Sequence, residues 1–188
     1  GEASRHMIIS RTPLRISFIG GGTDLPSFYQ KEIGVVVSAS IQKYVYVLIH
    51  PFFHRRIQLK YSETETVKNV NDIKSPVFRE VLRMFNIEEH VEISVVADIP
   101  KDGGSGLGGS TAFSTGLIHA LSVFVNSPLN KVQCAEWSTV LEIGKLRNPI
   151  GKQDQYASAL GGINKLVFQP DDSVQFEPIQ LDAEVEEE

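Results

Sequence analysis

Ile99-Pro-Lys-Asp-Gly-Gly-Ser-Gly-Leu-Gly-Gly-Ser-Thr-Ala-Phe113 is the stretch of this 188-residue chain that decides its fold. It joins an extended run to a segment in which apolar residues recur at helical spacing, at Phe113, Leu117 and Leu121. Its five glycines let the backbone adopt positive φ angles and bring N–H groups close to a ligand. A helix N-terminus also carries unpaired N–H groups and the positive end of the helix dipole, so the stretch predicts an anion site. A nucleotide phosphate is the expected anion.

Three kinds of phosphate loop compete with a simple tight turn as interpretations of this stretch. Gly104-Ser-Gly-Leu-Gly-Gly109 has the letters of a dinucleotide-binding loop, which also requires an acidic residue about 20 positions later. Residues 103–135 contain no Asp or Glu. A Walker A loop needs Lys before Ser or Thr, whereas Gly109 is followed directly by Ser110. The remaining pattern is Pro100-x-x-x-Gly-Ser-Gly-Leu-Gly-x-Ser110-x-Ala112, in which the Ser110 hydroxyl can reach a magnesium ion.

This pattern resembles the second motif of the GHMP small-molecule kinases, named for galactokinase, homoserine kinase, mevalonate kinase and phosphomevalonate kinase. Arg11-Thr-Pro-Leu-Arg-Ile-Ser-Phe-Ile-Gly-Gly-Gly-Thr-Asp24 is similar to the family's first motif, and Pro149-Ile-Gly-Lys-Gln-Asp-Gln-Tyr156 resembles the segment with the catalytic aspartate. Together these segments are most similar to the D-glycero-D-manno-heptose 7-phosphate kinase branch. One departure is Gly109, where many relatives have a serine.

The resemblance covers roughly residues 7–168. It implies an α+β fold, a two-layer domain in which a mixed sheet carries helices on one face, as in the GHMP kinase N-terminal domain. It also implies an ATP-dependent phosphotransferase with an alcohol group as acceptor, using ATP and Mg²⁺. Complete members add a C-terminal α+β domain, and we expect residues 7–181 to be the N-terminal domain without it.

The resemblance also assigns roles to individual residues. The ATP phosphates are expected on Gly103, Gly104, Ser105, Gly106, Leu107, Gly108, Gly109 and Ser110. Mg²⁺ is expected on Ser110 and Glu142; Glu142 lies twelve residues before Asp154, the family's spacing. Asp154 is expected to accept the sugar hydroxyl proton, while Arg15 offsets charge on the transferred group. Candidates for substrate binding are Gly21, Gly22, Thr23, Asp24, Lys43 and Lys152, the lysines for a phosphate on the substrate.

The substrate is the least determined part of this prediction. With heptose 7-phosphate, phosphorylation of the anomeric hydroxyl would give a 1,7-bisphosphate for nucleotide-activated heptose biosynthesis. Another GHMP sugar kinase, such as a fucokinase-like enzyme, stays open, as does a nucleotide- or sugar-binding fragment or sensor without activity. An oxidoreductase would need the ribose carboxylate that residues 103–135 lack.

Composition limits the class of protein. Five acids lie in the last seven residues, an acidic tail at 182–188, and the rest of the chain has 18 acidic and 18 basic residues, which argues against nucleic-acid binding. No apolar run approaches the roughly 20 residues of a membrane span, and no signal peptide is visible, so we expect a cytoplasmic protein. The single cysteine, Cys134, is interpreted as a packed core thiol. Residues 1–6, ahead of Met7, look like an expression scar. Oligomeric state is not predicted.

Local patterns predict the elements around the glycine loop. In the first strand, Leu14, Ile16 and Phe18 are expected to face the core, with Arg15 and Ser17 on the other side. Strands are predicted at 35–40, 44–50, 56–61, 91–97, 163–168 and 174–181, the second and third as a β-hairpin. Helices are predicted at 76–86 with a Ser75 cap, 110–125, 131–146 and 153–160.

Overall fold

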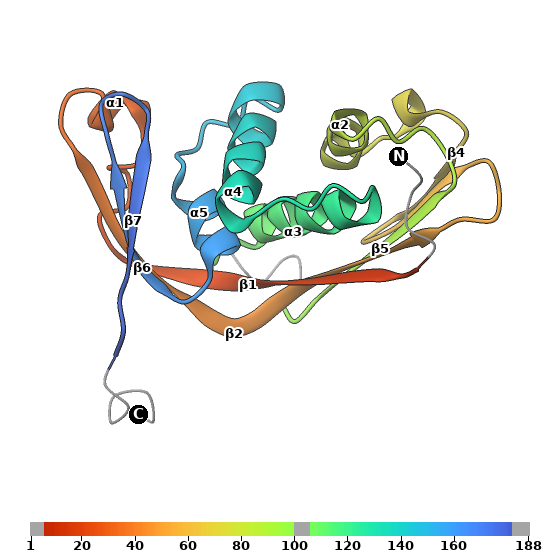
Figure 1. The fold of residues 1–188 in the computed structure, drawn as a ribbon. Helices are drawn as coiled ribbons and strands as arrows, with labels where there is room; N and C mark the ends of the chain where they lie inside the picture. Colours follow the sequence, from red (N-terminus) through yellow and green to blue (C-terminus); the bar gives the residue numbers. More distant parts are fainter. Residues whose placement is uncertain (1–5, 100–105, 182–188) are drawn as a thin grey trace.

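The computed structural model describes residues 6–99 and 106–181 of the chain. They form two layers: a sheet and a set of helices that all lie on one of its faces (Figure 1). The predicted two-layer α+β architecture is therefore confirmed. Among the described residues, no helix is long and apolar enough to cross a membrane.

The sheet has seven strands built around one long central strand. Its order is β4-β3-β5-β2-β6-β7, with β1 paired to the other edge of β2. The strands are β1 (Ile8–Ile19), β2 (Gly34–Pro51), β3 (Ile57–Lys60), β4 (Thr64–Val67), β5 (Val91–Ala97), β6 (Ile163–Phe168) and β7 (Val174–Pro178). The sheet is mixed, because β3 and β5 are parallel and the other pairs antiparallel.

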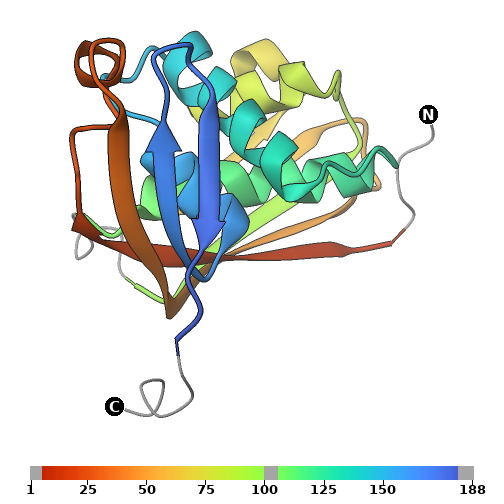
Figure 2. The same cartoon turned by 60° about the vertical axis from the view of Figure 1, so that its left-hand side comes forward.

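Strand β2 pairs with two different strands along the same edge. Its first part, Gly34–Ala39, pairs with β6, and its last part, Val45–Pro51, pairs with β5. The strand bends between these two segments (Figure 1). Figure 2 shows the first half of β2 beside the β6–β7 hairpin. The segments 35–40 and 44–50, predicted as separate strands, are thus one 18-residue strand.

The predicted hairpin between residues 44–50 and 56–61 is wrong. Strand β5 lies between β2 and β3, and β3 runs parallel to β5. Both segments are strands with one buried face, as predicted: Val47 and Ile49 in the first and Ile57 and Leu59 in the second are fully buried. Alternation of apolar residues does not tell which strand pairs with which, and here β5, a later segment of the chain, lies between the two.

The helical layer contains five α-helices among the described residues: α1 (Pro26–Tyr29), α2 (Pro76–Met84), α3 (Gly109–Phe124), α4 (Lys131–Thr139) and α5 (Gln153–Leu160). A 3₁₀ turn, η1 (Val70–Asp72), precedes α2, and a π-helical turn, η2 (Val140–Lys145), follows α4. Proline begins α2 as predicted, but the Ser75 side chain makes no capping hydrogen bond. The main core packs α2 and α3 against β2, β3 and β5.

Helix α3 packs closely against β1, and this contact determines where the N-terminus of α3 lies. A Cβ atom added to Gly116 would be 2.6 Å from the Thr12 hydroxyl oxygen, so only glycine fits there without a shift. The Ser10 hydroxyl donates a hydrogen bond to the Gly116 carbonyl at 2.8 Å. The contact brings the N-terminus of α3 next to the later part of β1.

Strand β1 departs from the predicted alternation. Leu14 is buried as expected, but Ile16 and Phe18 are 41% and 62% exposed, and Arg15 is buried. The register of β1 against β2 is irregular here: Pro13 pairs with Tyr44 and Arg15 with Ser40, so the extra residues lie on β2. On β1 the alternation of buried residues breaks at this point, and Arg15, directly after buried Leu14, reaches Asp154 on α5.

Candidate active site

Arg15 belongs to the first sequence motif and contacts both of the other two. Its Nε donates a hydrogen bond to Asp154 Oδ1 on α5 at 2.6 Å, and its Nη1 donates to the Gly106 carbonyl in the glycine loop. Its backbone N–H donates to the Leu107 carbonyl at 3.0 Å. The Arg15 and Asp154 side chains are 11% and 23% exposed, so the ion pair is shielded but reachable. Segments at both ends of the sequence therefore converge on one guanidinium.

The described part of the glycine loop leads directly into α3. Gly108 is the N-cap residue, with φ of 71°, and Gly106 has φ of 94°, both in the region that favours glycine. A Cβ atom on Gly108 would lie 3.3 Å from Arg15 Cγ. Among the described residues, no side chain caps the start of α3 and its first turn holds no acid. Its N–H groups are therefore available to an anion.

The rest of the predicted phosphate loop divides into two parts. Gly103, Gly104 and Ser105 lie outside the described residues. Gly109 and Ser110 form the first turn of α3, where Ser110 is exposed. The contacts expected of these residues with phosphate remain predictions.

Glu142 lies in the π-helical turn that follows α4. The Leu146 N–H donates to the carbonyl of Leu141, five residues earlier, at 2.8 Å. Leu141 and Glu142 are both buried, at 0% and 2% exposed. The predicted single α-helix over 131–146 is therefore wrong in form, because the α-helix ends at Thr139. The wider turn sends Leu141 into the core and Glu142 toward the start of α3.

One polar side chain holds the Glu142 carboxylate and a second lies beside it. The Thr111 hydroxyl donates to Oε2 at 3.1 Å. The Gln155 side-chain amide on α5 lies 3.5 Å from Oε1, and in its better-satisfied orientation its nitrogen donates to the Lys152 and Gly151 carbonyls instead. Thr111 is a site residue that the sequence analysis missed. The available signal was a second hydroxyl directly after Ser110, in the helical turn that was already assigned to the metal.

Burial decides the charge state of Glu142. Burial raises the pKa of Glu142 to about 7, because a carboxylate loses hydration inside the protein. The Thr111 hydrogen bond lowers the pKa in part, and the negative charge of Asp154 raises it. Among the described residues, the Asp154 carboxylate pairs with the Arg15 guanidinium, whereas the Glu142 carboxylate accepts only from a neutral donor. The described part of the site therefore holds two carboxyl groups and one cation.

These residues suit a magnesium ion. The described residues contain no group of three or more His, Cys, Asp and Glu side chains that would enclose a metal by themselves. Mg²⁺ prefers oxygen ligands and is usually held by one or two carboxylates, waters and substrate phosphates. Glu142 supplies such a carboxylate, and the Ser110 hydroxyl lies on the helical turn that carries its partner Thr111.

Two of the four first-motif residues expected at the substrate, Thr23 and Asp24, have side-chain partners within the protein. Thr23 donates its hydroxyl to the Gly20 carbonyl at 2.8 Å and accepts from the Val35 N–H at 3.0 Å. Asp24 is 2% exposed, and its carboxylate accepts hydrogen bonds from Gly22 and Gln153. These contacts hold the Asp24 carboxylate within the protein, and its expected contact with sugar hydroxyls remains a prediction.

The remaining substrate candidates lie in three places. Gly21 and Gly22 are exposed in the turn after β1. Lys152 has partners within the protein: its Nζ donates to the Asp172 carbonyl at 3.1 Å and lies 5.1 Å from the Tyr29 ring centroid. Lys43 is exposed at the bend of β2. Phosphate contacts of either lysine remain predictions.

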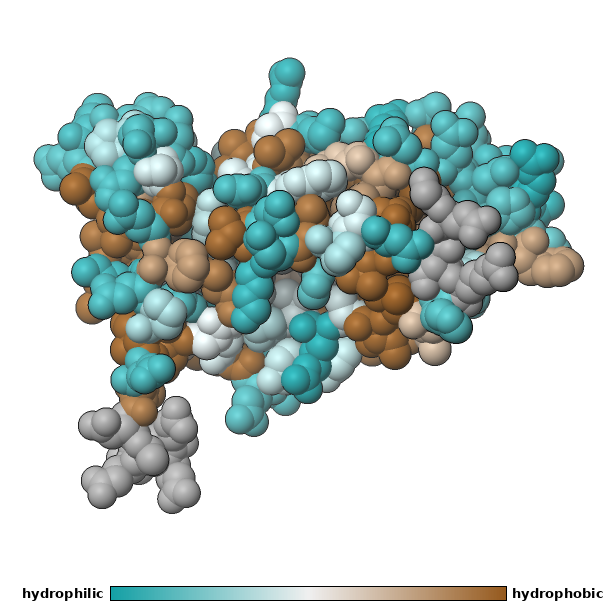
Figure 3. Space-filling model, in the orientation of Figure 1, coloured by the Kyte–Doolittle hydropathy of each residue, from teal (hydrophilic) through white to brown (hydrophobic). Residues whose placement is uncertain are grey.

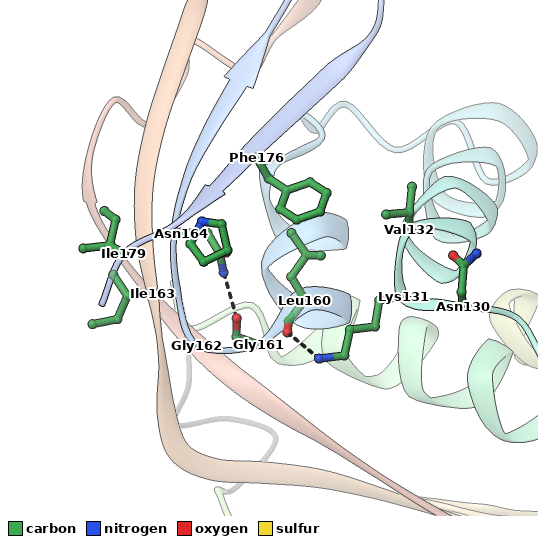
Figure 4. Close-up of a pocket in the computed structure, with 11 residues that line it drawn as sticks. Asn130, Lys131, Val132, Leu160, Gly161, Gly162, Ile163, Asn164, Phe176 and Ile179 are labelled. Carbon is green, nitrogen blue, oxygen red and sulfur yellow. Dashed lines mark hydrogen bonds between the residues drawn. The ribbon is translucent and has the colours of Figure 1, made fainter. Parts of the chain in front are cut away.

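A hollow of about 650 Å³ lies elsewhere, between the β6–β7 hairpin and the helices. Figure 4 shows Leu160, Phe176 and Val132 around it, and Figure 3 shows apolar residues on this side of the molecule. Its polar groups are already used, because Lys131 donates to the Leu160 carbonyl and Asn164 to that of Gly161. It lies at the end of α5 opposite Asp154, so we do not assign the chemistry to it.

The convergence of the three motifs agrees with comparisons to known proteins. A family model described as the GHMP kinases N terminal domain matches residues 67–162, just over half of the chain. The chain belongs to the GHMP kinase family. The predicted family is thereby confirmed.

Individual GHMP kinases are similar over nearly the whole chain. D-glycero-alpha-D-manno-heptose 7-phosphate kinase of Campylobacter jejuni is 28% identical over 186 residues, covering 93% of this chain and 54% of that protein. L-fucokinase/L-fucose-1-P guanylyltransferase of Bacteroides fragilis is 28% identical over 198 residues, covering 87% of this chain and 20% of that protein.

A solved structure gives the same result for the fold. The crystal structure of a D-glycero-D-manno-heptose 1-phosphate kinase from Bacteriodes thetaiotaomicron superposes with a TM-score of 0.85 at 25% identity. The match covers 95% of this chain and 61% of that one. This GHMP kinase chain thus spans 54% to 61% of the length of these two heptose phosphate kinases.

Proposed function

We propose that this chain is the ATP-binding part of a sugar kinase that phosphorylates the anomeric hydroxyl of D-glycero-D-manno-heptose 7-phosphate. The observation that carries the proposal is the contact of Arg15 with both Asp154 and the glycine loop. This contact puts a carboxylate next to the loop that leads into the uncapped start of α3. Phosphoryl transfer requires this kind of alignment and charge stabilisation more than it requires covalent chemistry.

Each residue of the site has one task in this mechanism. Asp154 Oδ1 is held by Arg15, which leaves Oδ2 to accept the proton of the sugar hydroxyl. The hydroxyl oxygen then bonds to the γ-phosphorus of ATP as the bond from that phosphorus to the β–γ bridging oxygen breaks, releasing ADP. The Arg15 guanidinium offsets negative charge on the transferred group. The N–H groups at the start of α3 bind the phosphates.

Glu142 and Ser110 would hold Mg²⁺, with Thr111 orienting the Glu142 carboxylate. A bound Mg²⁺ neutralises charge on the phosphates. Ionised Glu142 then gains the positive neighbour that the described residues do not provide.

The choice of heptose 7-phosphate rests on the two heptose phosphate kinases among the relatives. A second candidate is a fucokinase-like activity, which the Bacteroides fragilis relative favours. Cytoplasmic location is proposed together with the ATP requirement.

A panel assay tests the proposal. The chain is given ATP, Mg²⁺ and one of heptose 7-phosphate, fucose or galactose, and the phosphate position on any product is determined by NMR. We expect turnover with heptose 7-phosphate and phosphate on the anomeric carbon. Turnover confined to fucose would support the second candidate. Absence of magnesium-dependent ATP binding would refute both.

The variant Asp154→Asn tests the mechanism. Loss of a general base typically costs about 10²-fold or more in turnover, so we expect at least that loss with nearly unchanged ATP affinity. Asp171→Asn is the matched control, because Asp171 is exposed and bonds only to Ser173 in the described structure. Wild-type turnover in Asp154→Asn would refute the assigned role.

A further inference from the structure

The helix that carries Asp154 does not cap its own N-terminus. Helix α5 has eight residues and begins at Gln153, one residue before Asp154. Its N-cap residue, Lys152, makes no side-chain hydrogen bond to the helix. Unpaired N–H groups at a helix start require a partner when they are shielded from water.

Asp24 supplies this partner from a distant part of the chain. Its Oδ2 accepts a hydrogen bond from the Gln153 backbone N–H at 3.2 Å, across 129 residues of sequence. Its Oδ1 accepts from the Gln153 side-chain amide at 3.3 Å and from the Gly22 N–H at 3.1 Å. A carboxylate at a helix N-terminus is also favoured by the helix dipole.

Gly151 makes the close approach of Asp24 possible. A Cβ atom on Gly151 would lie 1.9 Å from Asp24 Oδ2 and 2.4 Å from Asp24 Cγ. It would also lie 2.9 Å from the Asp24 backbone oxygen, so rotation of the Asp24 side chain alone would not relieve the contact. Glycine at position 151 is therefore required by Asp24.

We propose that Asp24 is a positioning residue, which caps the helix of the catalytic carboxylate from the loop after β1, and that Gly151 is its steric complement. The segment from β1 through this loop then holds α5 at two points: Arg15 on Asp154, and Asp24 on Gln153. The two contacts fix both the position of the helix and the direction of the Asp154 side chain. The kinetic consequence rests on the proposed kinase activity, whereas the capping itself does not.

Hydrogen exchange tests the cap without any kinase activity. In Asp24→Ala, we expect the backbone amides of Gln153 and the next two residues to exchange about tenfold faster, the effect of a lost cap. In Asp24→Asn, we expect exchange within about threefold of wild type, since Asn caps helices as well as Asp does. Asp171→Asn is the control.

Kinetics distinguish positioning from direct sugar contact. A positioning role predicts that Asp24→Ala lowers kcat about tenfold or more with little change in KM for the sugar, and that Asp24→Asn restores kcat. It also predicts that Asp24→Ala lowers turnover no further in an Asp154→Asn background. A sugar contact predicts a raised KM in both Asp24 variants.

Gly151→Ala is the second variant, in case Asp24→Ala does not fold. We expect it to speed exchange at Gln153 and to lower kcat. Because Asp24→Ala shortens the opposing side chain, we expect the double variant to lose less unfolding free energy than the sum of the two single variants. Unchanged exchange at Gln153 in Asp24→Ala and in Gly151→Ala would overturn the proposal. Protected Gln153 exchange that depends on Asp24, in a protein without any turnover, would leave the cap established and count against the proposed activity of this chain alone.

Discussion

Replacement of Glu142 by Gln is expected to stabilise the ligand-free protein at high pH. Glu142 is 2% exposed and has no cationic partner among its described contacts, so its ionised form is costly. Its pKa is raised from 4.5 to about 7, mainly by burial. Gln is similar in size, is neutral at every pH, and keeps an oxygen that can accept the Thr111 hydrogen bond.

The pH range of the effect follows from the direction of this shift. Below pH 4.5, Glu142 is protonated in both the folded and the unfolded chain. Between pH 4.5 and about 7, the folded protein retains a proton that the unfolded chain has lost, so the stability of the wild type falls as pH rises. Above pH 7 the full difference applies, about 3 kcal/mol for this change in pKa.

Thermal or urea unfolding across pH 5 to 9 provides the assay. At pH 8 we expect Glu142→Gln to unfold at a temperature about 6–12 °C above wild type, and the two proteins to converge near pH 5. With ATP and Mg²⁺ added, we expect a smaller difference in unfolding temperature between the variant and the wild type, because Glu142 of the wild type then binds the ion. Parallel stability curves over the whole pH range, or a less stable variant at pH 8, would refute the reasoning.

Glu65→Gln is a matched control with the opposite sign. Burial alone would raise the pKa of Glu65, but hydrogen bonds from the Lys74 N–H, the Tyr61 hydroxyl and the Ser75 N–H together lower it. A lowered pKa stabilises the folded state above the unfolded value and is lost as pH falls. Glu65→Gln is therefore expected to destabilise the protein at pH 8 and less so in acid.

Three further predictions concern other parts of the fold. Arg15→Lys is expected to lower turnover at least tenfold, because an ammonium lacks the planar fork that reaches both Asp154 and Gly106; steady-state kinetics would show this. Cys134 is expected to react with iodoacetamide at pH 8 at least about 100-fold more slowly than a free cysteine, since burial raises its pKa to about 11; mass spectrometry with and without denaturant checks this. Gly116→Ala is expected to cost about 1–3 kcal/mol of unfolding free energy through contact with Thr12, whereas Gly144→Ala, with open space around it, is expected to cost little in the same urea titration.

Much of the fold could be predicted from the sequence because it depends on local patterns. The helix at 153–160 and the strands at 91–97 and 163–168 have the predicted bounds. The neighbours of β2 could not be predicted, since pairing depends on which distant strand completes the sheet. The break in the alternation of β1 at Arg15 was also not predicted, and with it the burial of the residue that contacts the other two motifs.

The site shows the same division between local pattern and distant contact. The motifs correctly placed Arg15, the glycine loop and Asp154 in one region, as the hydrogen bonds between them show. The partners of Asp24 could not be predicted, because Gln153 lies 129 residues away and a buried aspartate looks like any other in sequence. The requirement for glycine at position 151 also cannot be predicted until the residue that faces it, Asp24, is known.

The π-helical turn at Glu142 is different, because its signal is present in the sequence. The apolar stripe predicted for this segment contains Cys134, Trp137 and Leu141, at spacings of three and four, and the next residue that packs on the main core is Leu146, at a spacing of five. An α-helix would return to the same face at residues 144 or 145, which are Gly and Lys and are exposed. Leu146 packs on the main core and its N–H bonds to the Leu141 carbonyl, so the spacing of five is that of a π-helical hydrogen bond. A break from three-and-four to five in an apolar stripe therefore marks where a helix widens, and here it marks the acid proposed to bind the metal.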